Sequence, residues 1–366
     1  MPMQGISKFF AVVLLIIAVV VSALLVAAAY TEYLSPAHVA LPALLGLVFP
    51  ILAVCAIILF IGLLLLCPKY ALVPLGALLL SIPALWQYFP INFGKEHIDT
   101  NRGTFTLLSY NVYYFKDTEK EPGADEVAYN RTLQNIIDYN ADIVVLQEIG
   151  GYFGVHKRNK ITQSQIDIIN KRYPHRILQN SLLLLSKYPA QTIYDTCYTE
   201  TASTVVYKVN IEGREVSIFN NHLESIGLNS EDKKLYVALA THPDSVSEKV
   251  SEIKGFTKKF LHAFEARAAQ VEAVDAVADS IGGNIIMCGD INDTPNSYAY
   301  HTLKTGREDA FLQLGTGPGF TYRADGMWVR IDHIFYEGDF TARALKKGNK
   351  RYSDHYPIWV EFEWDE

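Results

Sequence analysis

The fold of this 366-residue chain is indicated by one stretch, Asn284-Ile285-Ile286-Met287-Cys288-Gly289-Asp290-Ile291-Asn292-Asp293-Thr294-Pro295. Its first half is a short apolar run, typical of a buried strand, and the run is expected to break at Gly289 into a polar turn. In an extended segment, Asp290 and Asn292 would point the same way, so that a carboxylate and a carboxamide face one bound group. Such a pair suits a water molecule held against a phosphate. An Asx turn before a proline-initiated loop explains the same residues without any function.

Polar residues interrupt apolar runs in the same manner elsewhere along the chain. The segments are Leu108-Ser109-Tyr110-Asn111-Val112, Val144-Val145-Leu146-Gln147-Glu148, Phe219-Asn220-Asn221-His222-Leu223-Glu224-Ser225, Arg330-Ile331-Asp332-His333 and Ser353-Asp354-His355-Tyr356-Pro357. In residue type and in order, these segments resemble the motifs of the endonuclease/exonuclease/phosphatase superfamily, the DNase I-like metal-dependent phosphohydrolases. The resemblance covers about residues 103 to 364. Each motif is short, but five motifs in the family's order make coincidence a poor explanation.

The resemblance implies an α+β fold, a four-layer α/β/β/α sandwich in which two packed, mostly antiparallel sheets carry helices on their outer faces. The periodicity of the sequence agrees with this arrangement. Strands are expected at Phe105 to Val112, Asp142 to Glu148, Ser181 to Leu185, Ser203 to Val209 and Glu215 to Asn220, the last two joined as a hairpin across Glu212-Gly213. Helices are expected at Val127 to Tyr139 and over most of Ser230 to Ile281, with a break at Gly255.

Charged residues are distributed unevenly along the chain. Residues 1 to 90 contain only Lys8, Glu32 and Lys69, which leaves 30 basic and 38 acidic side chains, and a net charge of −8, in the remainder. The sequence therefore predicts a membrane anchor at residues 1–90, a linker at residues 91–102 and a catalytic domain at residues 103–366.

Three apolar runs in the anchor reach the length of about 20 residues that spans a bilayer. They are Phe9 to Ala29, Leu41 to Leu66 and Tyr70 to Phe89, the last interrupted by Pro74 and Pro83. A cleaved signal peptide is the alternative for the first run, because Ala27-Ala28-Ala29 resembles a cleavage site, but further apolar runs follow it. No charged residue lies within a run, which favours an anchor over a channel or transporter element.

The few positive charges of the anchor predict its orientation. Lys8 precedes the first run and Lys69 lies between the second and third, whereas the first loop has no Lys or Arg. The positive-inside rule then places the N-terminus in the cytoplasm, and three spans place the catalytic domain outside it. The resemblance is to a membrane-anchored member of bacterial type, so the bacterial inner membrane is the expected location.

Glu148 ends an apolar strand, where a carboxylate is costly unless it meets a cation; a solvated strand end is the alternative. Oxygen ligands indicate Mg²⁺ or Mn²⁺ rather than zinc. The resemblance makes Asn111 a neighbouring ligand or an orienter of the metal carboxylate, and it directs Asp354 toward the metal or its water. Many relatives carry an acidic second ligand where this chain has Tyr113, so a stable second metal site is not expected.

The resemblance also assigns catalytic roles. Asp290, positioned with Asn292, would orient and deprotonate the attacking water. His222 would contact the phosphate or protonate the leaving group, although a single histidine is more often structural. His355 would contact the phosphoryl oxygens, and Asp332 would hold its imidazole. The mechanism expected is in-line attack by water. Four neighbouring residues are expected to be structural: Arg267, Gln270, Arg330 and His333.

The charge of the catalytic domain bears on its substrate. A net charge of −8, without a dense Lys/Arg cluster beside the motifs, disfavours duplex DNA. Membrane tethering raises the local concentration of lipid headgroups, so a small or lipid-linked phosphoester is preferred. A nuclease acting on DNA or RNA is the first alternative, and a catalytically inactive binding domain is the second. The segment Lys254 to Phe264 fits either a helix resting on lipid or a core-packed helix with a basic edge. The oligomeric state stays open.

Overall fold

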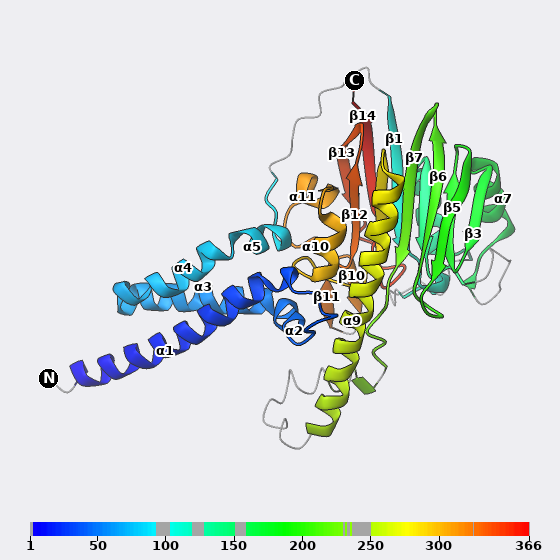
Figure 1. The fold of residues 1–366 in the computed structure, drawn as a ribbon. Coiled ribbons are helices and arrows are strands. Elements are labelled where there is room, and N and C mark those ends of the chain that lie inside the picture. The colour runs from blue at the N-terminus through cyan, green and yellow to red at the C-terminus, as the bar shows by residue number, and fades with distance from the viewer. Residues whose placement is uncertain are drawn as a thin grey trace.

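The computed structural model of the protein describes residues 3–92, 103–118, 128–150, 159–229, 231–232, 235, 250–324 and 326–365. Two six-stranded sheets pack face to face, in the orders β13-β14-β1-β2-β4-β3 and β5-β6-β7-β8-β12-β9. The pairs β1–β2 and β7–β8 are parallel, and the other pairs of these sheets are antiparallel. Helices cover both outer faces (Figure 1), so the predicted four-layer α+β sandwich is confirmed.

The first sheet consists of β1 (Thr104–Asn111), β2 (Ile143–Gln147), β3 (His175–Gln179), β4 (Leu182–Ser186), β13 (Phe340–Lys347) and β14 (Ile358–Trp364). The second consists of β5 (Ala190–Cys197), β6 (Ser203–Ile211), β7 (Arg214–His222), β8 (Ile285–Asp290), β9 (Glu308–Asp309) and β12 (Asp332–Glu337). A separate hairpin pairs β10 (Tyr322–Ala324) with β11 (Met327–Val329). The helices of this part are η3 (Tyr113–Phe115), α6 (Arg131–Tyr139), α7 (Gln163–Arg172), α9 (Val250–Ile281), α10 (Tyr298–Lys304) and α11 (Ala310–Leu314).

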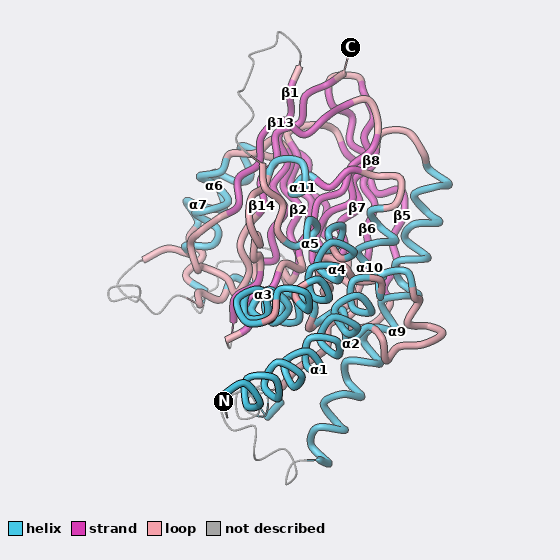
Figure 2. The backbone as a smooth tube through the Cα atoms, turned by 90° about the vertical axis from the view of Figure 1, so that its left-hand side faces the viewer, coloured by secondary structure: helices cyan, strands magenta, loops and turns pink. Residues whose placement is uncertain are grey.

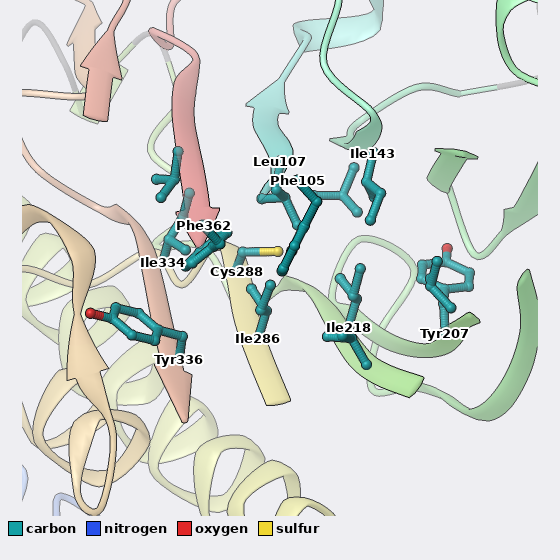
Figure 3. Packing of buried hydrophobic residues seen from close by; sticks show 14 of the residues in the cluster. Phe105, Leu107, Ile143, Tyr207, Ile218, Ile286, Cys288, Ile334, Tyr336 and Phe362 are labelled. Carbon is teal, nitrogen blue, oxygen red and sulfur yellow. The ribbon is translucent and has the colours of Figure 1, made fainter. Parts of the chain in front are cut away.

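The central strands are buried on both faces, which explains why they appear in the sequence as continuous apolar runs. In β8, Ile286 and Cys288 point into the core between the sheets, whereas Ile285 and Met287 pack under α9 and α10. In Figure 3, Ile286 and Cys288 meet Phe105 and other residues of the facing sheet across the core. Side chains of alternate residues thus define an inner and an outer face on every central strand.

The strand β8 continues through Gly289 to Asp290, so the predicted break at Gly289 is wrong. Gly289 has φ 121, and an added Cβ would lie 2.1 Å from the carbonyl oxygen of Asn221 on β7. Glycine is therefore required by the close approach of the parallel neighbour rather than by a turn. The predicted hairpin at Glu212-Gly213 is confirmed, since Ile211 pairs with Arg214 across it.

Two helix predictions need correction. The helix α6 begins at Arg131 because the side chain of Asn130 accepts a hydrogen bond from the Leu133 amide and caps the helix; Val127, the predicted start, lies outside the described residues. The helix α9 continues through Gly255, whose Cβ position is open, so the predicted break there is wrong. A single exposed glycine costs only about 1 kcal/mol within a long helix. Part of the expected helical stretch, residues 236–249, lies outside the described residues.

The apolar N-terminal quarter of the chain forms helices that project from one side of the sandwich (Figures 1 and 2). They are α1 (Met3–Ala29), η1 (Thr31–Tyr33), α2 (Ala43–Leu47), α3 (Phe49–Leu66), η2 (Pro68–Tyr70), α4 (Leu72–Leu80) and α5 (Ile82–Tyr88). Two segments, Phe9–Tyr33 and Phe49–Leu66, are long and apolar enough to cross a membrane. The expected third span is a pair of helices bent by 60° beside Pro83, and it counts as a span only if the pair crosses as a unit.

These helices contact the segment that follows β8. The Tyr88 hydroxyl donates to Thr294 Oγ1 at 3.0 Å, and Asn296 Nδ2 donates to the Ala28 carbonyl at 2.8 Å. The guanidinium of buried Arg330, at the entrance to β12, donates to the Gln87 carbonyl. Hydrogen bonds to the N-terminal helices therefore hold the loop between Asp290 and α10 in place.

Replacing Thr294 with Val is expected to lower the free energy of unfolding of the full-length protein by about 1 kcal/mol, because the Tyr88 hydroxyl loses its best partner and retains a 3.4 Å contact to the Gly46 carbonyl. Thermal unfolding in detergent measures the loss. The variant Tyr88→Phe and the double variant complete a double-mutant cycle. Additive losses would show that this hydrogen bond does not couple the two parts.

Candidate active site

Three polar side chains continue the inner-face rows of the second sheet. Asp290 follows Ile286 and Cys288 on β8, and the same alternation places Asp332 of β12 and His222 of β7 on the inner face. The strand register pairs Asp290 with both His222 and Asp332. All three side chains are buried. At one end of these strands, the core of the sandwich therefore contains ionisable side chains in place of apolar ones.

The facing sheet brings Asn111, at the end of β1, and Glu148, directly after β2, to the same place. Asn111 Nδ2 donates to Glu148 Oε1 at 3.1 Å and to Asp290 Oδ2 at 3.0 Å. Its Oδ1 accepts from the Tyr113 amide at 3.1 Å, which fixes the orientation of the carboxamide. Of the two roles expected for Asn111, these contacts favour the orienter of the carboxylates over the ligand.

Glu148 adopts the left-handed backbone region with φ 54, a conformation that costs free energy for a residue of this type. Its Oε1 lies 3.4 Å from His222 Nε2, and Asp290 Oδ2 lies 3.9 Å from the same nitrogen. His222 Nδ1 lies 2.6 Å from the Thr201 carbonyl oxygen, which can only accept, so Nδ1 carries a proton. Burial opposes the charged imidazole, but Glu148 and Asp290 outweigh it and raise the pKa of His222.

The predicted contact between Asp332 and His355 is confirmed. Asp332 Oδ2 lies 2.8 Å from His355 Nδ1, and His355 Nε2 lies 3.6 Å from Asp290 Oδ2. Thr321 Oγ1 accepts hydrogen bonds from the Asp332 amide and from the preceding amide, and Ser353 Oγ donates to the Asn111 carbonyl. Burial alone would lower the pKa of His355, but the carboxylates of Asp332 and Asp290 raise it to about 10.

Replacing Asp332 with Asn is expected to make activity depend more steeply on pH. In the native protein the raised pKa keeps His355 protonated through neutrality. Without the Asp332 carboxylate, this pKa falls toward the ordinary value of about 6.5, so the imidazolium is lost as the pH rises. The kcat of the variant relative to the native protein should therefore decline between about pH 6 and about pH 8. If kcat of the variant and of the native protein depended on pH in the same way, the role expected for Asp332 would be contradicted.

Asn292 lies differently from the expectation. The chain is not extended after Asp290, because Asn292 has φ 54, so the two-residue spacing does not place both side chains on one face. Instead, the Asn292 amide donates to Asp290 Oδ1 at 2.9 Å and its Nδ2 donates to the Leu223 carbonyl at 2.9 Å. Asp354 is half-buried, its Oδ1 lies 3.2 Å from Ser353 Oγ, and its pKa is raised by burial and by Glu148.

Two groups of side chains bring ligand atoms within 4.8 Å of one another in the described part of the chain. The first contains Glu148, His222 and Asp290, and the second contains Asp290, Asp332 and His355. Asp354 belongs to neither group. The carboxylates of Glu148 and Asp290, both bound by Asn111, supply the oxygen donors that suit Mg²⁺ or Mn²⁺.

The residues expected to be structural have structural partners. Arg267 Nε donates to Asp293 Oδ2 at 3.1 Å, and its Nη1 donates to the Glu224 carbonyl at 2.7 Å. Gln270 Oε1 accepts from the Glu224 amide at 2.9 Å. His333 Nε2 lies 3.2 Å from the Asp293 carbonyl oxygen, and burial lowers the pKa of this imidazole to about 3. Arg330 is also structural: its guanidinium donates to the Gln87 carbonyl of α5 and lies 4.2 Å from the ring centroid of Phe311 on α11.

Several residues of the site carried no signal in the sequence. The Thr201 carbonyl fixes His222, Thr321 fixes Asp332, and the ring of Tyr322 lies 5.0 Å from that of His355. Thr201 acts through its backbone, which no residue pattern marks. Thr321 and Tyr322 lie about ten residues before Asp332, at the start of the β10–β11 hairpin.

Residues 108–355 match the model of the Endonuclease/Exonuclease/phosphatase family, and residues 8–88 match a model described as a domain of unknown function, DUF8431. No curated protein matches the chain in sequence. An endonuclease/exonuclease/phosphatase from Beutenbergia cavernae is similar in structure, with 16% identity, a TM-score of 0.48, and 72% of each chain covered. D. rerio TDP2 complexed with a single strand DNA product has 18% identity and a TM-score of 0.46, over 71% of this chain and 99% of that one. The endonuclease/exonuclease/phosphatase from Bacteroides vulgatus has 15% identity and a TM-score of 0.44, over 72% of this chain and 100% of that one.

Proposed function

The chain belongs to the endonuclease/exonuclease/phosphatase family, and we propose that it is a membrane-anchored, Mg²⁺-dependent phosphoesterase acting on a small or lipid-linked phosphodiester or phosphomonoester. The observation that carries the proposal is the convergence of two imidazoles and two further carboxylates, those of Glu148 and Asp332, on Asp290 at a largely buried end of the inter-sheet core. Burying ionisable groups costs free energy of folding, and such a cluster is typical of a catalytic centre.

We assign the general base to Asp290. Burial, and next the negative charge of Asp332, raise the pKa of Asp290, which makes its carboxylate a stronger base than a solvated one. Asn111 holds Oδ2, and the backbone amide of Asn292 holds Oδ1. In the proposed step, the carboxylate takes a proton from water as the water oxygen forms a bond to phosphorus and the bond to the leaving oxygen breaks in line.

We assign the positive charges of the step to the two histidines. His222 presents Nε2 toward Glu148 and Asp290, and it would donate the Nε2 proton to the leaving oxygen. His355, kept protonated by Asp332, would contact the phosphoryl oxygens as negative charge develops on them. A divalent cation held by Glu148, with Asp354 directed toward it, would neutralise charge on the phosphate.

The substrate proposal depends on charge and tethering. The domain has a net charge of −8, and counterion release from DNA requires a basic face. The full-length protein should therefore hydrolyse phospholipid or small phosphodiester substrates faster than plasmid DNA at physiological salt. Rates on the two substrate classes, measured side by side with Mg²⁺, decide between the phosphoesterase and the nuclease. A clear preference for DNA would refute the substrate class and leave the reaction type intact.

The anchor proposal concerns residues 1–90. We infer three spans, with the bent pair α4–α5 as the third, and a catalytic domain on the outer side of a bacterial inner membrane. The support is the position of Lys8 and Lys69 relative to the apolar helices. A reporter fused after Glu366 should be active only outside the cytoplasm. Cytoplasmic activity would contradict the orientation, and release of a soluble domain would favour the signal-peptide alternative.

A further inference from the structure

A groove of about 590 Å³ lies between α11, the β10–β11 hairpin and β13. The residues of its lining that matter here are Phe311, Thr316, Arg323, Trp328, Lys347 and Tyr356. In Figure 1, α11 and β13 lie at the side of the sandwich nearest to α5. The elements that line the groove therefore lie on the side of the sandwich from which the N-terminal helices project.

The groove combines positive charge with aromatic surface. The guanidinium of Arg323 lies 3.7 Å from the ring centroid of Trp328, and Lys347 Nζ lies 4.5 Å from that of Tyr356. No Asp or Glu is among the lining residues that the structure describes, although the domain carries a net charge of −8. Burial lowers the pKa of Lys347, so its ammonium would gain from an anionic partner. Two cations beside aromatic rings suit an anion that carries an apolar group.

The groove is also tied to the point where the chain leaves the apolar helices. The Gly317 amide donates to the Pro90 carbonyl at 2.8 Å, and Asn92 Nδ2 donates to the Leu312 carbonyl at 2.9 Å. Pro90 lies two residues after the end of α5. The side chain of Trp328 is 48% exposed at the rim, and tryptophan is enriched where proteins meet the bilayer interface.

One wall of the groove belongs to the segment that carries His355. Tyr356 directly follows His355, and its amide donates to the Thr321 carbonyl at 2.7 Å. The Arg323 amide donates to the Asp354 carbonyl at 2.9 Å. These two backbone hydrogen bonds flank His355, and a ligand in the groove would contact Arg323 and Tyr356, which make them.

We propose that this groove binds the phosphate headgroup of an anionic membrane lipid. Arg323 and Lys347 contact the phosphate oxygens, while Trp328 and Tyr356 pack against the adjacent apolar part of the lipid. The inference rests on the proposed function in one respect, the anchoring of residues 1–90 in a bilayer. It narrows the substrate class, because a lipid phosphate bound here lies beside the segment that holds His355.

Calorimetric titration of the full-length protein in an uncharged detergent tests the proposal. The probe is dihexanoyl phosphatidic acid, and dihexanoyl phosphatidylcholine and inorganic phosphate are titrated separately. Saturable binding of phosphatidic acid is expected, and Arg323→Gln combined with Lys347→Gln should weaken it at least about tenfold. Lys346→Gln is the matched control, because Lys346 lies on the same strand over the ring of Trp359 and is not part of the groove lining.

Three results would overturn the proposal: equal binding of phosphatidylcholine, inorganic phosphate binding as tightly as phosphatidic acid, or unchanged affinity in the double variant. Thermal unfolding verifies that each variant is folded, and Lys347→Gln alone replaces the double variant if that protein does not fold. Hydrolysis of bis(p-nitrophenyl) phosphate by the unaltered protein is measured in the same preparation. Hydrolysis without lipid binding contradicts the groove only, and lipid binding without hydrolysis contradicts the proposed function only.

Discussion

Replacing Asp290 with Asn is expected to lower kcat by at least about a hundredfold, the usual contribution of a positioned general base. Asn keeps the shape of the side chain and can still accept from the Asn292 amide, but it cannot take a proton from water. In the native protein, Asp290 Oδ2 accepts a hydrogen bond from Asn111 and lies 3.6 Å from His355 Nε2 and 3.9 Å from His222 Nε2. The measurement is the steady-state rate of phosphodiester hydrolysis at saturating Mg²⁺.

The matched control for this variant is Glu224→Gln. Glu224 lies two residues after His222, and its carboxylate accepts from Thr199 at the surface, so the substitution removes one negative charge near the site without entering it. Thermal unfolding establishes that both variants are folded. A folded Asp290→Asn protein with near-normal kcat would show that another group activates the water.

Replacing Glu148 with Gln is expected to raise the Mg²⁺ concentration required for half-maximal activity at least about tenfold, the lower end of the loss seen when groups supporting a metal are removed. Glu148 is partly exposed at the site mouth, and Asn111 holds its Oε1. The nearby His222 imidazole and the Asn111 carboxamide outweigh burial and lower the pKa of Glu148, so its carboxylate is charged at neutral pH and available to a cation. A Mg²⁺ titration of the hydrolysis rate measures the shift.

Excess metal separates binding from chemistry in this variant. If Glu148 holds the cation, high Mg²⁺ or Mn²⁺ should restore much of the rate in Glu148→Gln, whereas Asp290→Asn should not respond. An unchanged Mg²⁺ requirement in the variant would remove Glu148 from the metal site. The group formed by Asp290, Asp332 and His355 would then be the alternative.

The end-of-strand positions of the site could be predicted because apolar strands buried on both faces leave a clear mark where a polar side chain appears. Asp290, His222 and Glu148 each follow such a run, and the structure brings all three together. The pairing of β7 with β8 and of β8 with β12 places His222, Asp290 and Asp332 side by side.

The geometry within the site could not be predicted from spacing. The alternation argument for Asn292 fails because the chain turns directly after Asp290, with Asn292 at φ 54. The position of Gly289 predicts a turn, yet its role is to admit the backbone of Asn221. The sequence does not predict strands β3 and β5; β5 is only half-buried, so its sequence lacks a continuous apolar run.

The contacts of the N-terminal helices with the catalytic loop are also invisible in the sequence. Tyr88 and Thr294 are separated by 206 residues, and neither stands out in its own segment. For the basic stretch of α9, Lys254 to Phe264, the composition alone fits both a helix resting on lipid and a core-packed helix with a basic edge. Phe260 and Phe264 are buried, which favours the core-packed helix with a basic edge.

The central claim is that this chain hydrolyses a phosphoester with the help of a divalent cation, and one measurement tests it most directly. The full-length protein, purified in detergent, is incubated with bis(p-nitrophenyl) phosphate in Mg²⁺ and again with excess chelator. We expect release of nitrophenolate in Mg²⁺, its loss on chelation and its recovery when Mg²⁺ or Mn²⁺ is restored. A folded protein that releases no product from this ester, or from a wider panel of diesters and monoesters, under any of these conditions would contradict the claim and favour the inactive binding domain.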